Sequence, residues 1–391
     1  MKKLKIAMFM DSWYPDVNGV ILVMDNLIRN MSDYADVTLV VPKMERKCDD
    51  SKYPYKIIRV DSVPLVIAKY RLAMVDFEYF KLKKIFDKED FDIVHIHSPF
   101  AMGRLGVRVA RSKGIPVVST MHTRWEAEFK RYLKSSTIAN LCVKHLIKTF
   151  NKCDNSIILN NALINVYNDY GYTGEYTIIN NGTEMELVRD RDKALSLVNK
   201  KFNLDKNEIV LLFVGRITTV KNVFFILDVL SELKKRNFKF RMIYVGDGPD
   251  YDNLKQKVKE HHLEKDVILA GKIMDRELLK SIYYRANLFL FPSVYDSSSL
   301  VQIEAASQET PSVFIEGAVT ADTATNNVNG FFAKEEVKDY ADKIEYIFNN
   351  KDLYEEVKKN ARRDLAKSWK DIAKETYSYY ISIINKSTKV S

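Results

Sequence analysis

The sequence predicts an α/β protein made of two doubly wound domains. Short, nearly continuous apolar runs alternate with segments of helical apolar spacing, a pattern typical of parallel strands covered by helices on both faces. The alternation occurs twice along 391 residues, of which 46% are hydrophobic. A chain of this length exceeds one ordinary core and suits two domains.

The first series of elements predicts the N-terminal domain. A strand at residues 6–10 is followed by a turn-rich loop and then by a helix at 20–30. The other expected strands lie at 37–41, 56–60, 92–97 and 116–121, with helices at 77–86 and 100–112.

The second series predicts a similar domain, with strands at 208–214, 240–245, 267–270, 288–291 and 312–315. We place the boundary near residue 185, which gives domains at 1–185 and 186–369, and we expect a short helix plus connector at 189–207. Helical apolar spacing over 368–385 predicts a terminal helix that packs back across either domain.

Composition limits the class of protein. Lys plus Arg number 61 against 52 Asp plus Glu, a net charge of +9, which favours attraction to phosphates, acidic lipids or nucleic acid. No apolar run approaches the about 20 residues of a membrane span, and the first run is too short for a signal sequence, so we expect a cytoplasmic protein. Cys48, Cys142 and Cys153 lack the spacing of a zinc site or a disulfide framework and are expected to be buried or incidental thiols.

A basic segment at 129–153 is the strongest local charge feature. Lys144, Lys148 and Lys152 recur every four residues and would form one stripe on a helix beside apolar positions. One interpretation is peripheral contact with an anionic membrane at the inner face of the cell membrane. The alternative is a packed helix with a solvated basic face.

The loops after the strands carry the motifs. Parallel sheets bind ligands at the carboxyl ends of their strands, so we expect these loops to face one cleft between the domains. The Ser-rich segment at 296–304 should open a helix, and Ser299 and Gln302 fit a capping box that leaves backbone N–H groups facing an anion.

Two cations stand after another expected strand. Gly215 allows close approach of the backbone, and Arg216 and Lys221 could neutralise a diphosphate. Gly246 and Gly19 lie in turns that could also meet phosphate. Plain turns and solvated charges are the structural alternatives.

Two carboxylates and the histidines complete the candidates. Apolar neighbours predict that Glu304 is partly buried with a hydrogen-bonded partner, such as ribose hydroxyls, whereas Asp296 could hold sugar hydroxyls or be an ordinary turn residue. We expect His95 to be a satisfied core histidine and His122 to lie beside the reacting carbon. No His or Cys spacing indicates a metal site, so we expect no essential metal.

Taken together, these motifs resemble the retaining family-four glycosyltransferases of the GT-B fold. The resemblance runs over nearly the whole chain and rests on segments 15–19, 92–97, 116–122, 181–182, 215–221, 245–249, 296–304 and 329–331. It implies two facing Rossmann-like domains, a nucleotide sugar held mostly by the second, an acceptor held mostly by the first, and a terminal helix at 370–391 that crosses back to the first.

The resemblance also implies roles for single residues. The implied catalytic residues are His122, Arg216, Lys221 and Asp296. The implied donor-binding residues are Gly19, Gly215, Arg216, Lys221, Gly246, Lys272, Ile273, Asp296, Ser298, Ser299, Leu300 and Glu304. The implied acceptor-binding residues are His97, Thr123, Trp125 and Glu126.

Within that family, segment 120–126 and the basic helix resemble members that glycosylate membrane lipids. The resemblance therefore implies transfer of a hexose from a nucleotide diphosphate sugar, expected to be a UDP-sugar, to a lipid or cell-surface glycan hydroxyl by front-face displacement. Asp296 stands where the family usually has Glu, which leaves the identity of the donor sugar open. The alternatives are a nucleotide-sugar epimerase of the same fold and a nucleic-acid-binding protein, although the chain has no aromatic RNA-binding signature and we expect no nucleic-acid partner.

Overall fold

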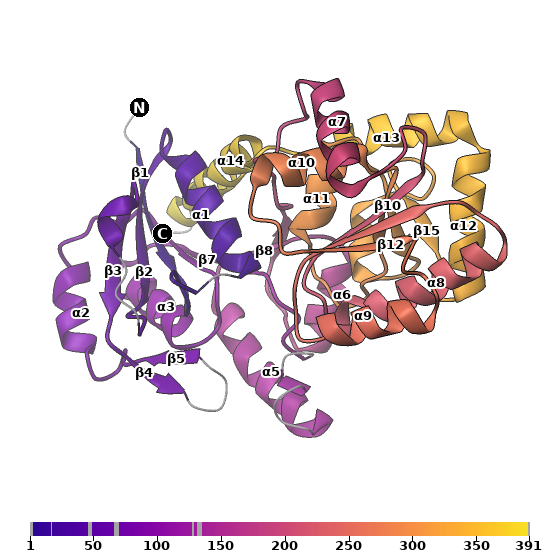
Figure 1. The fold of residues 1–391 in the computed structure, drawn as a ribbon. Helices are drawn as coiled ribbons and strands as arrows, with labels where there is room; N and C mark the ends of the chain where they lie inside the picture. Colours follow the sequence, from indigo (N-terminus) through magenta and orange to yellow (C-terminus); the bar gives the residue numbers. More distant parts are fainter. Residues whose placement is uncertain are drawn as a thin grey trace. The chain divides into compact units, whose positions relative to one another are not determined.

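The computed structural model describes residues 3–16, 18–45, 49–65, 70–126, 129–130 and 135–389. The chain divides into two compact units, Met1–Asn181 with Trp369–Ser391, and Gly182–Ser368. Each unit contains one parallel sheet with helices around it (Figure 1). The predicted fold class, two doubly wound α/β domains, is confirmed.

The sheet of the N-terminal unit has seven strands in the order β3-β2-β1-β6-β7-β8-β9. The strands are β1 (Leu4–Phe9), β2 (Ala35–Pro42), β3 (Lys56–Val60), β6 (Ile93–Ile96), β7 (Val117–Met121), β8 (Asn155–Ile158) and β9 (Tyr176–Ile178). The helical segments are α1 (Gly19–Met31), η1 (Asp50–Lys52), α2 (Tyr79–Phe86), α3 (Ala101–Lys113), α5 (Ser136–Phe150) and α6 (Ala162–Asp169). Strand order reverses between β1 and β6, and such a switch point is where doubly wound sheets form a ligand crevice.

The C-terminal unit has a six-stranded sheet in the order β12-β11-β10-β13-β14-β15. Its strands are β10 (Val210–Val214), β11 (Arg241–Val245), β12 (Val267–Gly271), β13 (Leu288–Phe291), β14 (Ser312–Ile315) and β15 (Phe331–Ala333). Its helical segments are α7 (Arg191–Phe202), η2 (Thr219–Lys221), α8 (Val223–Lys235), α9 (Tyr251–Glu260), α10 (Arg276–Arg285), α11 (Leu300–Ser307), η3 (Val319–Thr323), α12 (Val337–Asn349) and α13 (Lys351–Leu365). Here the switch point lies between β10 and β13.

Two apolar clusters cover the two faces of this second sheet. Along β10, Leu211 and Phe213 join one cluster, whereas Leu212 and Val214 join the other. Successive side chains of a strand point to opposite faces, so a strand buried on both sides needs an unbroken apolar run. This explains why the strands were visible in the sequence.

The terminal helix α14 (Trp369–Thr388) belongs to the N-terminal unit and packs on α1. Its fully buried Tyr380 hydrogen-bonds His95 at 2.6 Å, and Tyr377 packs on Tyr34 with ring centroids 5.3 Å apart. The return of the terminal helix to the first domain, which the resemblance implied, is confirmed.

Two local features differ from the sequence prediction. The antiparallel pair of β4 (Ser62–Leu65) and β5 (Tyr70–Ala73) was not predicted, because it lies outside the main sheet and the side chains of β4 show no buried alternation. The basic helix α5 ends at Phe150, so Lys152 lies in the following turn and only Lys144 and Lys148 belong to the helical stripe. Arg131 and Lys134 of the same basic segment lie outside the described residues. No helix in the described part of the chain is long and apolar enough to cross a membrane.

Candidate active site

The C-terminal unit brings Lys221 and Asp296 together across the switch point of its sheet. Lys221 ends η2 after β10, and Asp296 lies in the loop after the neighbouring strand β13. The Lys221 ammonium donates to Asp296 Oδ1, and both side chains are about three-quarters buried, with exposed fractions of 24% and 21%. Asn222 helps to hold the two loops together, because its Nδ2 donates to the Pro292 carbonyl at 3.3 Å. The two sequence motifs, 75 residues apart, therefore form one ion-paired site.

Unpartnered polar atoms occur in the β13–α11 connection and in the first turn of α11. Asp296 Oδ2, Ser293 Oγ and Gln302 Oε1 are buried and have no hydrogen-bond partner among the described residues. Buried polar atoms are almost always paired, and an unpaired carboxylate oxygen costs free energy. The connection is therefore suited to accept hydroxyl donors from a ligand.

Arg216 differs from Lys221 in being free. It is exposed, directly follows the β10–Gly215 junction, and has no hydrogen-bond or ion-pair partner among the residues that the structure describes. A guanidinium at the carboxyl end of a parallel strand can form bidentate hydrogen bonds with a phosphate.

The glycines of the neighbouring loops permit close contact of backbone with backbone. A Cβ at Gly246, where φ is +145°, would lie 1.8 Å from the Gly215 carbonyl oxygen, and a Cβ at Gly248 would lie 2.2 Å from that of Ile217. The N–H groups of Gly215 and Gly246 donate to the carbonyls of Val245 and Gly271 at 3.0 and 2.9 Å. These two amides are thus engaged within the protein, and the glycines shape the loop instead of offering donors to a ligand.

The predicted capping box at the start of α11 is wrong, although the helix does begin at Leu300. Ser299 is the N-cap residue but makes no capping hydrogen bond with its side chain. Gln302 cannot reach back because it is buried and its Nε2 donates to Thr323 of η3 at 3.3 Å. Ser298, Ser299 and Leu300 nevertheless stand where the expected anion-facing turn was placed, between β13 and α11.

Glu304 is partly buried and hydrogen-bonded, as its apolar neighbours predicted. Its Oε1 pairs with Arg276 at 3.1 Å and its Oε2 accepts from the Tyr283 hydroxyl at 3.0 Å. Burial raises the pKa of the Glu304 carboxyl, while Arg276 and Tyr283 oppose that rise. Arg276 also contacts Glu184 at 3.1 Å. Arg276 and Tyr283 were missed in the sequence because both are remote from Glu304 along the chain and neither lies in a recognisable motif.

The expected base-binding residues follow the edge strand β12. Lys272 is exposed, and Ile273 is partly buried against the apolar cluster of this unit. Gly271, which ends β12, has φ of +66° and accepts the Gly246 amide, so this loop is tied to the β11–α9 loop.

The N-terminal unit holds a row of three histidines at the ends of β6 and β7. His95 is satisfied on both nitrogens, by Tyr380 at 2.6 Å and Thr120 at 2.8 Å, as predicted for a core histidine. His97 Nδ1 bonds His122 Nε2 at 3.0 Å, and the His95 and His97 rings lie 3.9 Å apart. Burial lowers the pKa of His95 and of His122 to about 3 and lowers that of His97 well below its usual value. All three rings are therefore neutral at physiological pH.

Asp11 is a polar residue of this unit that the sequence interpretation overlooked. It follows β1, accepts from Ser98 Oγ at 2.6 Å and from the Met102 amide in the first turn of α3 at 3.0 Å. Burial raises the pKa of the Asp11 carboxyl, opposed by these hydrogen bonds and by Arg104. Its position directly after the first strand was the available signal. Asp11 caps α3 and holds the β1 and β6 loops together.

The remaining candidates of the N-terminal unit follow the carboxyl ends of β1 and β7. Trp125 packs edge-on against Phe100 with ring centroids 5.0 Å apart, and Glu126 pairs with Lys130. Thr123 lies beside them in the loop after β7 and is half-buried. Gly19 begins α1, whose N-terminus is capped by the Asn18 side chain bonding the Ile21 amide at 3.0 Å. The acceptor candidates Thr123, Trp125 and Glu126 therefore lie in the N-terminal unit, and so does Gly19, for which the resemblance implied a role in donor binding.

Thiols and metal ligands are few in the described residues. Cys142 and Cys153 are free thiols, and burial raises the pKa of Cys153 to about 12, whereas Cys48 lies outside the described residues. The described residues contain no group of three or more His, Cys, Asp or Glu side chains arranged to hold a metal ion.

Comparison with known families identifies the class of protein. A glycosyltransferase family 4 model matches residues 17–187, and a glycosyl transferases group 1 model matches residues 197–364. The two matches together span most of both units. The chain belongs to the family-4 glycosyltransferases, and it is a glycosyltransferase of the GT-B fold.

Individual relatives share much of the chain. An alpha-monoglucosyldiacylglycerol synthase of Streptococcus pneumoniae is 27% identical over 79% of this chain and 70% of its own length. The enzyme of the same name from Acholeplasma laidlawii is 25% identical over 99% of both chains. Among solved structures, Anabaena Alr3699/HepE in complex with UDP aligns with a TM-score of 0.75 at 15% identity, covering 97% of this chain and 100% of that one.

Proposed function

We propose that this glycosyltransferase moves a hexose from a UDP-sugar to a hydroxyl of a membrane lipid, with retention of configuration at the anomeric carbon. The proposal rests on the ion pair between Lys221 and Asp296. The second Asp296 oxygen, Oδ2, has no partner among the described residues, and Arg216, in the same β10–α8 connection as Lys221, also has none. A nucleotide sugar requires both cations for a diphosphate and acceptors for sugar hydroxyls, and this site offers both.

The geometry of the C-terminal unit supports a proposed role for each donor-binding residue. Arg216 binds the diphosphate directly, because its guanidinium has no hydrogen-bond or ion-pair partner to give up among the described residues. Lys221 shares its charge between the diphosphate and Asp296, whose second carboxylate oxygen accepts from a sugar hydroxyl. Glu304 accepts from the ribose hydroxyls with the lone pairs that Arg276 and Tyr283 leave unused.

The proposed reaction is a front-face displacement. The acceptor oxygen forms a bond to the anomeric carbon on the face from which the diphosphate leaves, and the hydroxyl proton passes to the departing phosphate oxygen. Charge grows on that phosphate as the bond breaks, and preorganised cations stabilise it. Arg216 and Lys221 are the residues proposed for this role, and His122 of the N-terminal unit is proposed to contact the donor sugar.

Relatives support UDP as the nucleotide. The complexes of Anabaena Alr3699/HepE contain UDP or UDP-glucose, and the complex of pneumococcal GtfA contains UDP and GlcNAc. The loop of Lys272 and Ile273 at the end of β12 is proposed to contact the base.

Relatives and surface chemistry both support a lipid acceptor. The two relatives described above are named for the glucosylation of diacylglycerol. In this chain, α5 presents Lys144 and Lys148 together with the exposed apolar side chains Ile138 and Leu141, 52% and 63% exposed. Cations beside exposed apolar groups are the pattern that binds an anionic bilayer. The proposal therefore includes peripheral contact of α5 with the membrane that holds the acceptor.

A screen of donors followed by a transfer assay tests the proposal. A thermal-shift series over UDP-, GDP- and ADP-sugars should show stabilisation by a UDP-sugar alone, since only a ligand that binds the folded state raises the melting temperature. Incubation of that donor with diacylglycerol vesicles should then give a glycolipid whose anomeric proton, by NMR, matches the donor configuration. Inversion at the anomeric carbon, or conversion of the donor without an acceptor, would contradict the proposed reaction.

A further inference from the structure

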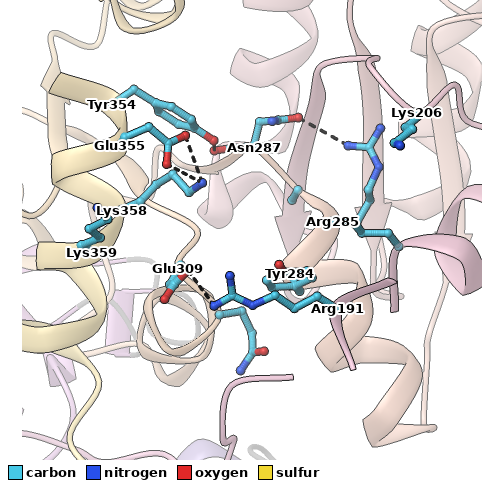
Figure 2. A pocket seen from close by; sticks show the side chains of 13 residues that line it. Arg191, Lys206, Tyr284, Arg285, Asn287, Glu309, Tyr354, Glu355, Lys358 and Lys359 are labelled. Atoms are coloured by element: carbon cyan, nitrogen blue, oxygen red, sulfur yellow. Dashed lines mark hydrogen bonds and ion pairs between the residues drawn. The ribbon is translucent and has the colours of Figure 1, made fainter. Parts of the chain in front are cut away.

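The C-terminal unit contains a cavity of about 340 Å³ at the edge of its sheet opposite the candidate active site. Arg285 ends α10 and Asn287 immediately precedes β13, so the cavity lies at the amino ends of the strands. The loops of Arg216 and Asp296 follow the carboxyl ends. Figure 2 shows the cavity between α13, which carries Lys358 and Lys359, and the wall formed by Arg285 and Lys206. The cavity is therefore separate from the donor site.

Arg285 is a buried cation without a hydrogen-bonded carboxylate. It is 5% exposed, and its guanidinium donates to neutral oxygens only: the side chain of Asn199 at 2.7 Å and the carbonyls of Asp205 and Glu208 at 2.9 Å. The remaining contact, from Nη1 to Asn287 Oδ1, is long at 3.5 Å. The Glu208 carboxylate is near enough to favour the charged form of Arg285. It accepts a hydrogen bond from the Asp205 amide at 3.2 Å and none from the guanidinium. Nη1 thus retains donor capacity.

Buried charges in proteins are normally paired with an opposite charge. Burial lowers the pKa of the Arg285 guanidinium, as expected for a charge taken out of water with incomplete compensation. An anion at this position would complete the pairing.

The residues that line the cavity carry an excess of positive charge. The lining contains five cationic and two anionic side chains. Lys206 and Lys359 have no hydrogen-bond or ion-pair partner among the described residues. Arg191 reaches Glu309 only at 3.8 Å, and Lys358 pairs with Glu355 at 3.2 Å. Two lysines are therefore free to meet a ligand.

We propose that this cavity is a second anion site, which binds a small molecule bearing a phosphate or diphosphate group through Arg285, Lys206 and Lys359. Its volume is in the range of small-molecule sites, which begins at about 300 Å³. Guanidinium and ammonium groups match phosphate oxygens in both charge and hydrogen bonding. The Tyr354 hydroxyl, which donates to the Asn287 carbonyl at 3.0 Å, fixes the α13 side of the cavity.

Calorimetric titration with inorganic pyrophosphate on the full chain tests this site. The unmodified protein should bind at two classes of site, because the donor loops offer the second. The double variant Lys206→Ala/Lys359→Ala should weaken one class by about tenfold or more, since each charge-assisted hydrogen bond is strong. Arg216→Ala should weaken the other class and leave the cavity class unchanged. Unlike Arg285, the two lysine side chains make no hydrogen bond or ion pair with the residues that the structure describes, so their loss should leave the fold intact.

A matched control separates the local effect from the net charge. Lys255→Ala/Lys259→Ala on α9 removes two exposed lysines from the same unit and should bind pyrophosphate as the unmodified protein does. Equal affinity and stoichiometry in the cavity variant and in this control would overturn the proposal. A single class of site that disappears with Arg216→Ala would overturn it as well.

Discussion

At the scale of single residues, Asp296 carries the clearest functional signal. Its Oδ1 is neutralised by Lys221, whereas its Oδ2 is buried without a donor. The carboxylate is shorter than the Glu usual at this position in the resembled family, so the sugar would lie closer to the backbone of the β13–α11 loop. Leaving the Asp296 Oδ2 atom without a donor costs free energy, and a ligand hydroxyl that donates to this atom would remove that cost.

Two substitutions of Asp296 should separate the effect of its charge from the effect of its side-chain length. Asp296→Asn removes the charge-assisted bond to Lys221 and should lower kcat/KM for the donor by roughly tenfold to a hundredfold, because such bonds contribute about 1.5–3 kcal/mol. Asp296→Glu keeps the charge and should retain more activity while changing the preference among donor sugars. Steady-state kinetics over several UDP-sugars measure both effects, with the exposed Asp252→Asn as control. An unchanged kcat/KM in Asp296→Asn would remove the carboxylate from donor binding.

Arg216 should contribute mainly to the chemical step. Because Arg216 has no partner in the described part of the chain, its guanidinium is available as the leaving group gains charge. Loss of such a preorganised donor lowers turnover by about two orders of magnitude. Arg216→Ala should show this loss in kcat, and Arg216→Lys should recover part of it. The exposed Arg189→Ala serves as the control. A normal kcat in Arg216→Ala would exclude the proposed role.

The buried contact between His97 and His122 should fix a tautomer. His97 Nε2 is buried and has no hydrogen-bond partner among the residues that the structure describes. An unpaired lone pair is tolerated better than an unpaired N–H. His97 is therefore expected to donate from Nδ1 to His122 Nε2, which leaves the His122 proton on Nδ1.

Nitrogen-15 NMR of the imidazoles measures that tautomer directly. His97→Phe removes the hydrogen bond to His122, so the His122 ring should no longer be held in one tautomer. The loss of one net hydrogen bond should lower kcat by about tenfold. His97→Gln, which can still donate an N–H, should recover part of the rate. An Nε2-protonated His122 in the unmodified protein would contradict the assignment whatever the activity of the variants.

At the scale of elements, the sequence predicted what local periodicity encodes. The strands of both sheets are continuous apolar runs because helices cover both faces, and this pattern marks them without tertiary information. The pair β4–β5 was missed because it lies outside the main sheets. The capping box was wrong because the four-residue pattern says nothing of Thr323, which takes the Gln302 amide instead.

Helix α5 is the element for which the sequence left two interpretations. The structure buries Val143, Leu146 and Ile147 and exposes Lys144 and Lys148, which suits a packed helix with a solvated face. The exposed Ile138 and Leu141 are not required by that interpretation and favour membrane contact.

Liposome flotation should decide between these interpretations. Lys144→Ala/Lys148→Ala/Lys152→Ala should lose most binding to anionic vesicles, because each cation near such a surface contributes about 1 kcal/mol. The charge-matched control Lys255→Ala/Lys259→Ala/Lys265→Ala removes exposed lysines of the C-terminal unit and should float as the unmodified protein does. Equal flotation of the two triple variants would leave the stripe as an ordinary solvated face.

At the scale of the whole molecule, the contacts that the sequence could not predict join distant segments. His95 meets Tyr380 across 285 positions, Asp11 meets Ser98 across 87, and Asp296 meets Lys221 across 75. The motifs indicated which loops carry chemistry, since strand ends are visible in the sequence. The side chains that orient those motifs depend on strand order and helix packing, which no local pattern encodes.

The distribution of buried titratable groups predicts that the two units respond differently to acid. His95, His97 and His122 all belong to the N-terminal unit, and the pKa of each is lowered by burial. A histidine that is neutral when folded binds more protons when unfolded, so its stabilising contribution is complete above pH 6.5 and declines as the pH falls toward about 3. For His95 alone this amounts to about 2 kcal/mol between pH 6.5 and pH 5. Asp11, whose pKa is raised by burial, acts in the opposite direction.

Differential scanning calorimetry should therefore resolve two transitions that are perturbed independently. Lowering the pH from 7.5 to 5 should lower the transition temperature of the N-terminal unit more than that of the C-terminal unit. UDP should raise only the transition temperature of the C-terminal unit, because Arg216, Lys221 and Glu304, which are proposed to bind the diphosphate and the ribose, belong to that unit. His95→Phe should reduce the acid sensitivity of the first transition and leave the response to UDP unchanged. A UDP shift confined to the N-terminal transition would place the nucleotide in the wrong unit and contradict the donor site, whereas equal acid sensitivity of both transitions would show that the histidine row does not govern the stability of the first unit.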